Sequence, residues 1–136
     1  MKSKNMHTSL GRAIILVKDY DEAFDFYEKN FFCRKIFDYV APSGQRFLHI
    51  GFSDDDDSVG VWFLKADNGE QQSYIGKQTA GQPTLVIYTD DCDKLYNHLQ
   101  ANGVTIIEQL VITTGSKFFH CLDLYGNRLT VVELDA

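Results

Sequence analysis

The sequence lacks the features that mark several classes of protein. Its three cysteines, Cys33, Cys92 and Cys121, are odd in number, far apart and outside any Cys-x-x-Cys pair. This argues against a disulfide framework or a zinc ribbon, and for reduced thiols in a cytoplasm. No apolar run approaches the roughly 18 residues of a membrane span, and the polar start, MKSKNMHTS, has no apolar core of a signal peptide. We therefore expect a cytoplasmic protein without a membrane segment.

The sequence also has fewer basic than acidic side chains. Lysine and arginine total 13 against 19 aspartates and glutamates, which gives a net charge of −6. That charge repels phosphate and anionic lipid, so nucleic acids and membrane surfaces are excluded as expected partners. A chain of 136 residues with 44% hydrophobic content can bury one core. It is expected to fold as a single domain over residues 1–136.

The clearest positive feature is an internal repeat. The segment SGQRFLHI at Ser43–Ile50 matches TGSKFFHC at Thr114–Cys121, a shift of 114 − 43 = 71 residues. A second match aligns Asp19 with Asp91, a shift of 91 − 19 = 72 residues. A repeat of this length indicates a supersecondary unit that cannot bury its sheet alone.

Each copy of the repeat is predicted to contain a strand, a helix and three further strands. In the first copy the apolar strand at residues 10–17 precedes a helix capped by Asp19 or Asp21. In the second copy Asp90 or Asp91 caps the helix, and the last two strands form a hairpin turning at Tyr125-Gly126-Asn127. The predicted fold class is α+β, with two tandem βαβββ modules at residues 8–66 and 83–135 and a linker at 67–82. Two such sheets placed edge to edge, with both helices on one face, leave a concave cup suited to a small molecule.

Four consecutive aspartates at residues 54–57 allow two interpretations. One is a cation site, and the other is a solvated hairpin loop. Calcium loops alternate their acidic residues with others and place a glycine and a distal glutamate at fixed offsets, which this segment does not. The solvated loop is the favoured interpretation.

Three segments together resemble the vicinal oxygen chelate superfamily, which includes glyoxalase I, extradiol dioxygenases, fosfomycin-resistance transferases and bleomycin-resistance proteins. They are LVKDYDEAFDFYEKNF at 16–31, YTDDCDKLYNHLQANGV at 88–104 and LDLYGNRLTVVEL at 122–134. Their order, spacing and duplication extend over nearly the whole chain. The resemblance implies a glyoxalase-like or bleomycin-resistance-like fold, and a metal held by four strand positions that are usually His or Glu.

Carried over residue by residue, the resemblance places those four positions at Arg12, Phe63, Thr84 and Thr130. Divalent transition metals need imidazole, carboxylate or thiolate ligands, and none is present at these positions. Glu133 lies three residues past the last position, so strand alternation directs it to the opposite face. We therefore predict no metal and no cofactor at the family site.

The predicted lining of the cup is apolar and aromatic, with one cation and two hydroxyls. It consists of Arg12, Ile14, Phe63, Thr84, Val86, Tyr88 and Thr130. Arg12 either anchors a carboxylate or phosphate group through paired hydrogen bonds, or is an arginine at a strand end that reaches solvent.

The histidines His49 and His120 are related by the repeat, and alternation places both on the cup face. They are candidates for a catalytic base or for ligands of a relocated metal, and the alternative is a structural role within the sheet. His7 and His98 are interpreted as a tail residue and an exposed helix residue.

Two classes of function stay open from the sequence. The favoured one is a metal-free protein that binds a small planar or acidic molecule without turning it over. The alternative is a lyase or dioxygenase of the glyoxalase-like group with a relocated metal site. The resemblance also implies a homodimer. A second indication is a set of large aromatic residues that exceeds what two short helices can cover: Phe31, Phe32, Phe37, Tyr39 and Trp62.

Overall fold

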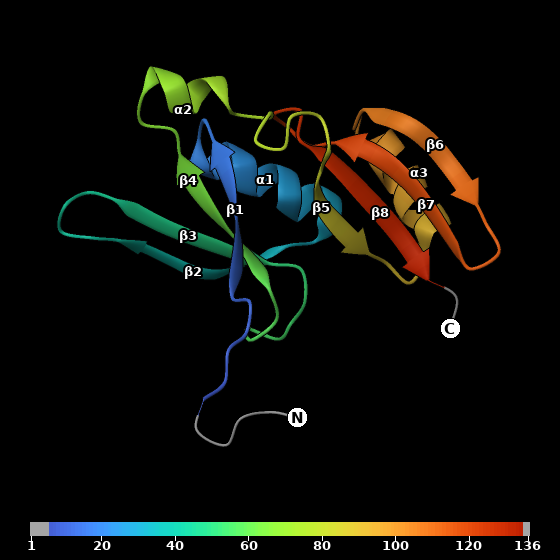
Figure 1. Cartoon of the computed structure of the whole chain (residues 1–136), viewed down its shortest axis with the longest axis horizontal. Helices are drawn as coiled ribbons and strands as arrows, with labels where there is room; N and C mark the ends of the chain where they lie inside the picture. The colour runs from blue at the N-terminus through green and yellow to red at the C-terminus, as the bar shows by residue number, and fades with distance from the viewer. Residues whose placement is uncertain (1–5, 135–136) are drawn as a thin grey trace.

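The computed structural model describes residues 6–134, which form eight strands and three helices (Figure 1). The first half contains β1 (Arg12–Val17), α1 (Tyr20–Phe31), β2 (Arg34–Val40), β3 (Arg46–Gly51) and β4 (Gly60–Lys65). After α2 (Gly69–Ser73), the second half contains β5 (Pro83–Tyr88), α3 (Cys92–Ala101), β6 (Ile106–Ile112), β7 (Ser116–Leu122) and β8 (Arg128–Leu134). The βαβββ order thus occurs twice.

The strands form two four-stranded sheets of identical topology. Their orders are β1-β4-β3-β2 and β5-β8-β7-β6, and in each the first strand pairs in parallel with the last. The α+β class and the two tandem modules predicted from the repeat are confirmed. The two sheets are not closed into one, because no hydrogen-bonded strand pair joins them anywhere in residues 6–134.

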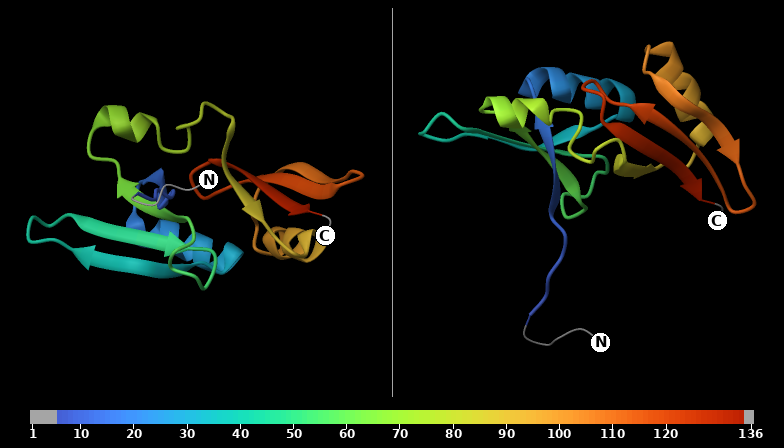
Figure 2. Two further views of the ribbon diagram at one scale, coloured as in Figure 1. Left: turned by 60° about the horizontal axis from the view of Figure 1, so that its bottom comes forward. Right: turned by 45° about the horizontal axis from the view of Figure 1, so that its top comes forward.

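Both long helices begin where their sequences indicate, and α3 also ends where its sequence indicates. The side chain of Asp19 accepts a hydrogen bond from the Glu22 N–H at the start of α1, and Asp91 does the same for Lys94 N at the start of α3. The helix α3 ends before Gly103, which has a φ of +78°. Figure 2 shows α1 and α3 on the same side of the two sheets.

One continuous core joins the two modules. The Tyr27 hydroxyl on α1 donates a hydrogen bond of 2.6 Å to the Asp123 carboxylate in the β7–β8 turn, and both residues are buried. The Asn102 amide after α3 donates to Asn30 Oδ1 on α1 at 3.0 Å. Module one therefore packs its helix against module two, in addition to being tied to it by the linker.

The segment between β4 and β5 is more ordered than its polar composition suggests, since it contains the short helix α2. The amide of Gln78 bonds the free edge of β1, accepting from Leu16 N at 2.6 Å and donating to Ile14 O at 2.9 Å. Gly76, at a φ of +76°, lies directly against the backbone of Tyr125. A side chain at position 76 would collide with that backbone, which explains why a glycine stands there.

The aspartate run forms an exposed loop between β3 and β4, in which Asp56 pairs with Arg34 and Asp57 N donates to Asp55 Oδ1 at 2.9 Å. The three cysteine thiols are free and buried. Within residues 6–134, no helix is both long and apolar enough to cross a membrane.

Candidate functional site

The candidate site lies on the sheet faces that the helices leave uncovered. In β1, Ile15 and Val17 are fully buried under the helices, so Arg12 and Ile14 point the other way. In β5 the same alternation places Thr84, Val86 and Tyr88 on this side, as the sequence predicts. Val86 and Tyr88 are exposed, Thr84 is half-buried, and Ile87 on the other side is buried. We call these surfaces the helix-free faces of the first and second sheets.

The helix-free face of the first sheet carries a cluster of aromatic side chains, which we call the aromatic wall. Trp62 on β4 lies 5.1 Å from the His49 ring and 5.9 Å from the Phe47 ring, measured between centroids. Phe37 on β2 meets the His49 ring edge-on at 5.6 Å, and Tyr39 lies 6.1 Å from Phe37. Five rings from three strands thus form one surface that suits a planar ligand.

Phe63, expected in the cup lining, is instead a core residue. It is fully buried and packs against Tyr27 of α1 at 5.6 Å. The pairing register shows the reason: Trp62 lies opposite Ile14, as Thr130 lies opposite Val86 in the second sheet. Trp62 is therefore the counterpart of Thr130, and the sequence assignment was wrong by one residue, which in a strand reverses the face.

Arg12 contacts the aromatic wall through His49. Its Nε donates to His49 Nδ1 at 3.2 Å, and its Nη1 donates to the Gly11 carbonyl at 2.7 Å. A ring nitrogen that accepts a hydrogen bond carries no proton, so the His49 proton resides on Nε2. Partial burial and the neighbouring Arg12 charge lower the pKa of His49. No carboxylate forms an ion pair with Arg12 in the described part of the chain.

The second sheet repeats this arrangement with different partners. His120 Nδ1 lies 2.9 Å from the Thr130 hydroxyl. Burial lowers the pKa of His120, the charge of Arg128 lowers it further, and Glu108 opposes both. Each helix-free face thus combines a neutral histidine with a guanidinium group, and the placement of both histidines on these faces agrees with the sequence prediction.

Two site residues escaped the sequence reasoning. Arg128 Nε and Trp62 Nε1 are buried atoms without a hydrogen-bond partner among the residues described. The pairing of His120 with Thr130 and of His49 with Trp62 across adjacent strands is the signal that identifies Trp62. Arg128 shares a face with Thr130 by simple alternation, a signal already available in the sequence.

The seven predicted lining residues do not meet at one point. Arg12 and Ile14 lie on the first sheet, whereas Thr84, Val86, Tyr88 and Thr130 lie on the second. The linker touches both sheets, because Gln78 bonds β1 and the Thr79 hydroxyl lies 2.9 Å from that of Thr84. The described strands pair only within each sheet, so the predicted lining is divided between two helix-free faces.

The residues at the family's metal positions do not fit a divalent metal. With the register corrected they are Arg12, Trp62, Thr84 and Thr130, a cation, an indole and two hydroxyls. Glu133 lies on the helix side, where it accepts a 2.7 Å hydrogen bond from Cys92 N. No group of three or more His, Cys, Asp and Glu side chains is placed to hold a metal ion within residues 6–134.

Comparison with known proteins identifies the family. The family model of the glyoxalase/bleomycin resistance protein/dioxygenase superfamily matches residues 9–131. The chain belongs to this superfamily. The chain is also similar to a protein from Shewanella frigidimarina (strain NCIMB 400), described as an uncharacterized protein, with 29% identity over 131 residues, which is 96% of each chain. The resemblance seen in the sequence motifs is thereby confirmed.

Solved structures show the same fold. The chain is similar to UcmS2, with a TM-score of 0.80 and 21% identity, covering 93% of this chain and 98% of that one. It is also similar to TnmS3, an antibiotic binding protein from Streptomyces sp. CB03234, with a TM-score of 0.75 and 19% identity over 95% and 98% of the two chains. At these identities the likeness establishes the superfamily fold alone.

Proposed function

We propose that this protein binds a small planar acidic molecule on its helix-free faces and leaves it chemically unchanged. The observation that carries the proposal is Arg12, a part-buried guanidinium beside the aromatic wall. Its charge has no carboxylate partner in the described part of the chain. A charge left uncompensated in a partly dry setting favours an anionic ligand, because charge-assisted hydrogen bonds are the strong ones.

Two further features support an acidic planar ligand. The unpaired donors Trp62 Nε1 and Arg128 Nε lie on the same faces and call for an acceptor. The rings of the aromatic wall reward a flat ligand through stacking and area burial. A binding role without turnover is also consistent with a fold neighbour, TnmS3, that is described as an antibiotic binding protein.

The same proposal includes the absence of a metal and of any other cofactor. The alternative, a lyase or dioxygenase with a relocated metal site, is favoured only by His49 and His120. Their Nδ1 atoms are engaged by Arg12 and Thr130, so a metal would have to bind Nε2 of each. Metal analysis of the dialysed full-length protein separates the two functions. Stoichiometric zinc, nickel, iron or manganese that is lost in His49→Ala would favour the enzyme.

We further propose a cytoplasmic homodimer. Phe37 and Tyr39 on the aromatic wall are 47% and 50% exposed. Of the other residues expected to need cover, Phe31 is buried by the chain itself, and Phe32 lies on the helix side, outside this surface. A second copy that sets its second sheet against the first sheet of this chain would join the two helix-free faces into one cup and cover part of this area. Light scattering at micromolar concentration should give about twice the 15.5 kDa of one chain, and the mass of one chain would contradict the proposal.

Calorimetric titration of aromatic acids against their amides tests the ligand class. Arg12→Ala should weaken the acids by about 1.5–3 kcal/mol, the range for hydrogen bonds to charged groups, and leave the amides unchanged. Trp62→Ala should weaken acids and amides alike, because it removes a ring of the wall. Arg34→Ala is the matched control, since it removes an exposed arginine that is paired with Asp56 outside the site.

The outcome that defeats the proposal is equally specific. If acids and amides bind the wild type equally well, or if Arg12→Ala and Arg34→Ala have the same effect, then Arg12 anchors no anion.

A further inference from the structure

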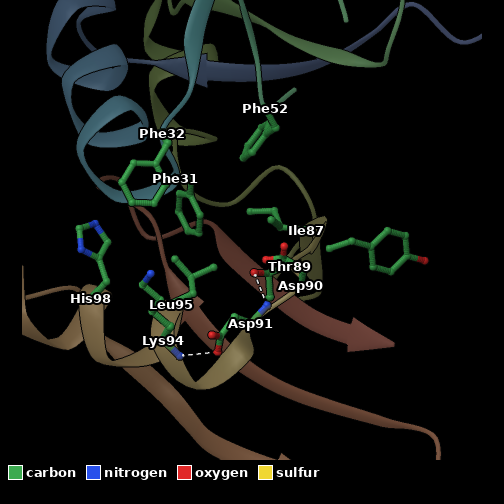
Figure 3. A pocket seen from close by; sticks show the side chains of 11 residues that line it. Phe31, Phe32, Phe52, Ile87, Thr89, Asp90, Asp91, Lys94, Leu95 and His98 are labelled. Carbon is green, nitrogen blue, oxygen red and sulfur yellow. Dashed lines mark hydrogen bonds between the residues drawn. The ribbon is translucent and has the colours of Figure 1, made fainter. Parts of the chain in front are cut away.

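A second cavity lies on the helix side of the molecule, where the end of α1 meets the first half of α3. It has a volume of about 350 Å³, at the small end of the range for ligand sites. Figure 3 shows Phe31, Phe32 and Phe52 across the cavity from Leu95 and His98, with Ile87 at the side. Of the residues predicted to line the helix-free faces, Tyr88 at the end of β5 also lines this cavity, whereas Arg12, His49 and Trp62 do not. The cavity therefore borders the second helix-free face at Tyr88 and is separate from the Arg12 site.

Phe32 adopts a backbone conformation that its residue type disfavours. It follows α1 with a φ of +60° and a ψ of +30°, in the left-handed region, and its N–H donates to Glu28 O at 3.0 Å. The helix end requires this conformation, and glycine is the residue that provides it most readily. Module two has a glycine after its helix, Gly103. A bulky side chain at such a position is an outlier that points to a role beyond ending the helix.

The side chain of Phe32 is held in place over the cavity. Its ring stacks on that of His98, with centroids 5.0 Å apart and planes inclined by 27°. His98 is fixed in turn, because its Nε2 lies 2.9 Å from the Lys29 carbonyl and donates to it. His98, expected from the sequence to be an exposed helix residue, is therefore half-buried and joins α3 to α1. Even so, Phe32 remains 68% exposed, so packing within the chain does not account for it.

The polar groups at the cavity are mostly acidic. Asp90, Asp91 and Lys94 line its edge, which gives two carboxylates against one ammonium group. One oxygen of Asp91 caps α3, and neither aspartate forms an ion pair within residues 6–134. The chain as a whole carries a charge of −6. Aromatic ring faces also attract cations, so the charge balance favours a positively charged ligand.

We propose that this cavity is a second binding site, which takes a small aromatic amine. The flat part of the ligand lies among Phe31, Phe32 and Phe52, and its ammonium group faces Asp90 and Asp91. The site thus has the opposite charge preference to the helix-free faces, where Arg12 favours an acid.

Three indole compounds of nearly the same size provide the test: tryptamine (a cation), tryptophol (neutral) and indole-3-acetate (an anion). Calorimetry on the full-length protein should show tryptamine binding at least tenfold more tightly than tryptophol at this site. Phe32→Gly should weaken tryptamine by tenfold or more, while its melting temperature equals or exceeds that of the wild type, because glycine suits the left-handed conformation. Asp90→Asn should remove the preference for tryptamine over tryptophol.

The control is Tyr74→Ala in the linker, which removes an aromatic side chain that is 51% exposed and is not part of the lining of either site. It should leave tryptamine binding unchanged. The proposal is overturned if tryptamine does not bind at millimolar concentration, or if Phe32→Gly binds it as the wild type does. It is also overturned if tryptamine competes with an acid whose binding depends on Arg12. Failure of indole-3-acetate to respond to Arg12→Ala would instead count against the helix-free-face site alone.

Discussion

Replacing Tyr27 by phenylalanine should loosen the contact between the two modules without changing the shape of the core. The substitution deletes one hydroxyl group, which donates to Asp123 Oδ2 at 2.6 Å. Tyr27 is 2% exposed and Asp123 is 6% exposed, so water cannot easily replace the lost donor. Asp123 keeps three donors, namely Tyr125 N, Asn127 N and Asn127 Nδ2. The Asp123 carboxylate therefore loses one hydrogen bond but is not left without partners.

The magnitude follows from the charge on the acceptor. A hydrogen bond to a charged group contributes about 1.5–3 kcal/mol to the free energy of unfolding. For a chain of this size, that loss lowers the melting temperature by roughly 5–12 °C. Urea unfolding followed by the fluorescence of Trp62, the single tryptophan, measures the change, and an unaltered m-value would show that the unfolded state is unaffected.

Tyr125→Phe is the matched control. Its hydroxyl also bridges the β7–β8 turn and the start of α1, lying 2.8 Å from Glu22 Oε2, but in an exposed setting. Exposed interactions of this kind contribute about 1 kcal/mol or less. If the two substitutions cost the same, or if Tyr27→Phe costs less than about 0.5 kcal/mol, then burial of the Tyr27–Asp123 bond is not what stabilises the contact between the modules.

Three further predictions concern the linker, the first histidine and the core. Gly76→Ala should destabilise the protein by clearly more than Gly81→Ala in the same urea assay. Both positions have a positive φ, which alone costs an alanine about 1–2 kcal/mol. Of the two, only Gly76 lies where a Cβ atom would collide with the backbone. In an NMR titration His49 should have a pKa below its ordinary value of 6.5, and Arg12→Ala should raise that pKa. The stability linked to His49 is then fully present above pH 6.5 and is lost as the pH falls through the lowered pKa. A titration midpoint at or above 6.5 would contradict the geometry. Phe63→Ala should lower the free energy of unfolding by about 3–5 kcal/mol, because it truncates a core side chain. If the variant stayed stable but no longer bound ligand, Phe63 would be a binding residue after all.

The fold was predictable because its evidence is repeated in the sequence. The match of Ser43–Ile50 with Thr114–Cys121 and the capping aspartates Asp19 and Asp91 all correspond to equivalent positions in the two modules. Helix periodicity indicated the buried face of α1 correctly, since Tyr27 and Phe31 are buried. Local patterns of this kind are set by nearest neighbours in the chain and need no tertiary information.

The site was harder to predict because it depends on register. From His49 to Trp62 is 13 residues, whereas from His120 to Thr130, its counterpart, is 10, so the aspartate loop adds three residues between β3 and β4. The prediction took the residue before Leu64 as the family position, without the pairing register, and so put Phe63 on the wrong face. The cavity beneath Phe32 was beyond prediction for another reason, since it forms only where α1 and α3 of different modules approach each other.

Gln78 has a consequence for how the chain behaves in a crowded solution. An unpaired strand edge is a template on which other chains can add strands, and β1 is such an edge. By satisfying one N–H and one C=O of β1, the Gln78 amide occupies the positions that an incoming strand would use. A single side chain from the linker thus protects this edge of the first sheet from strand addition. We expect that its exchange for a residue without an amide would expose this edge of β1 to strand addition by other chains.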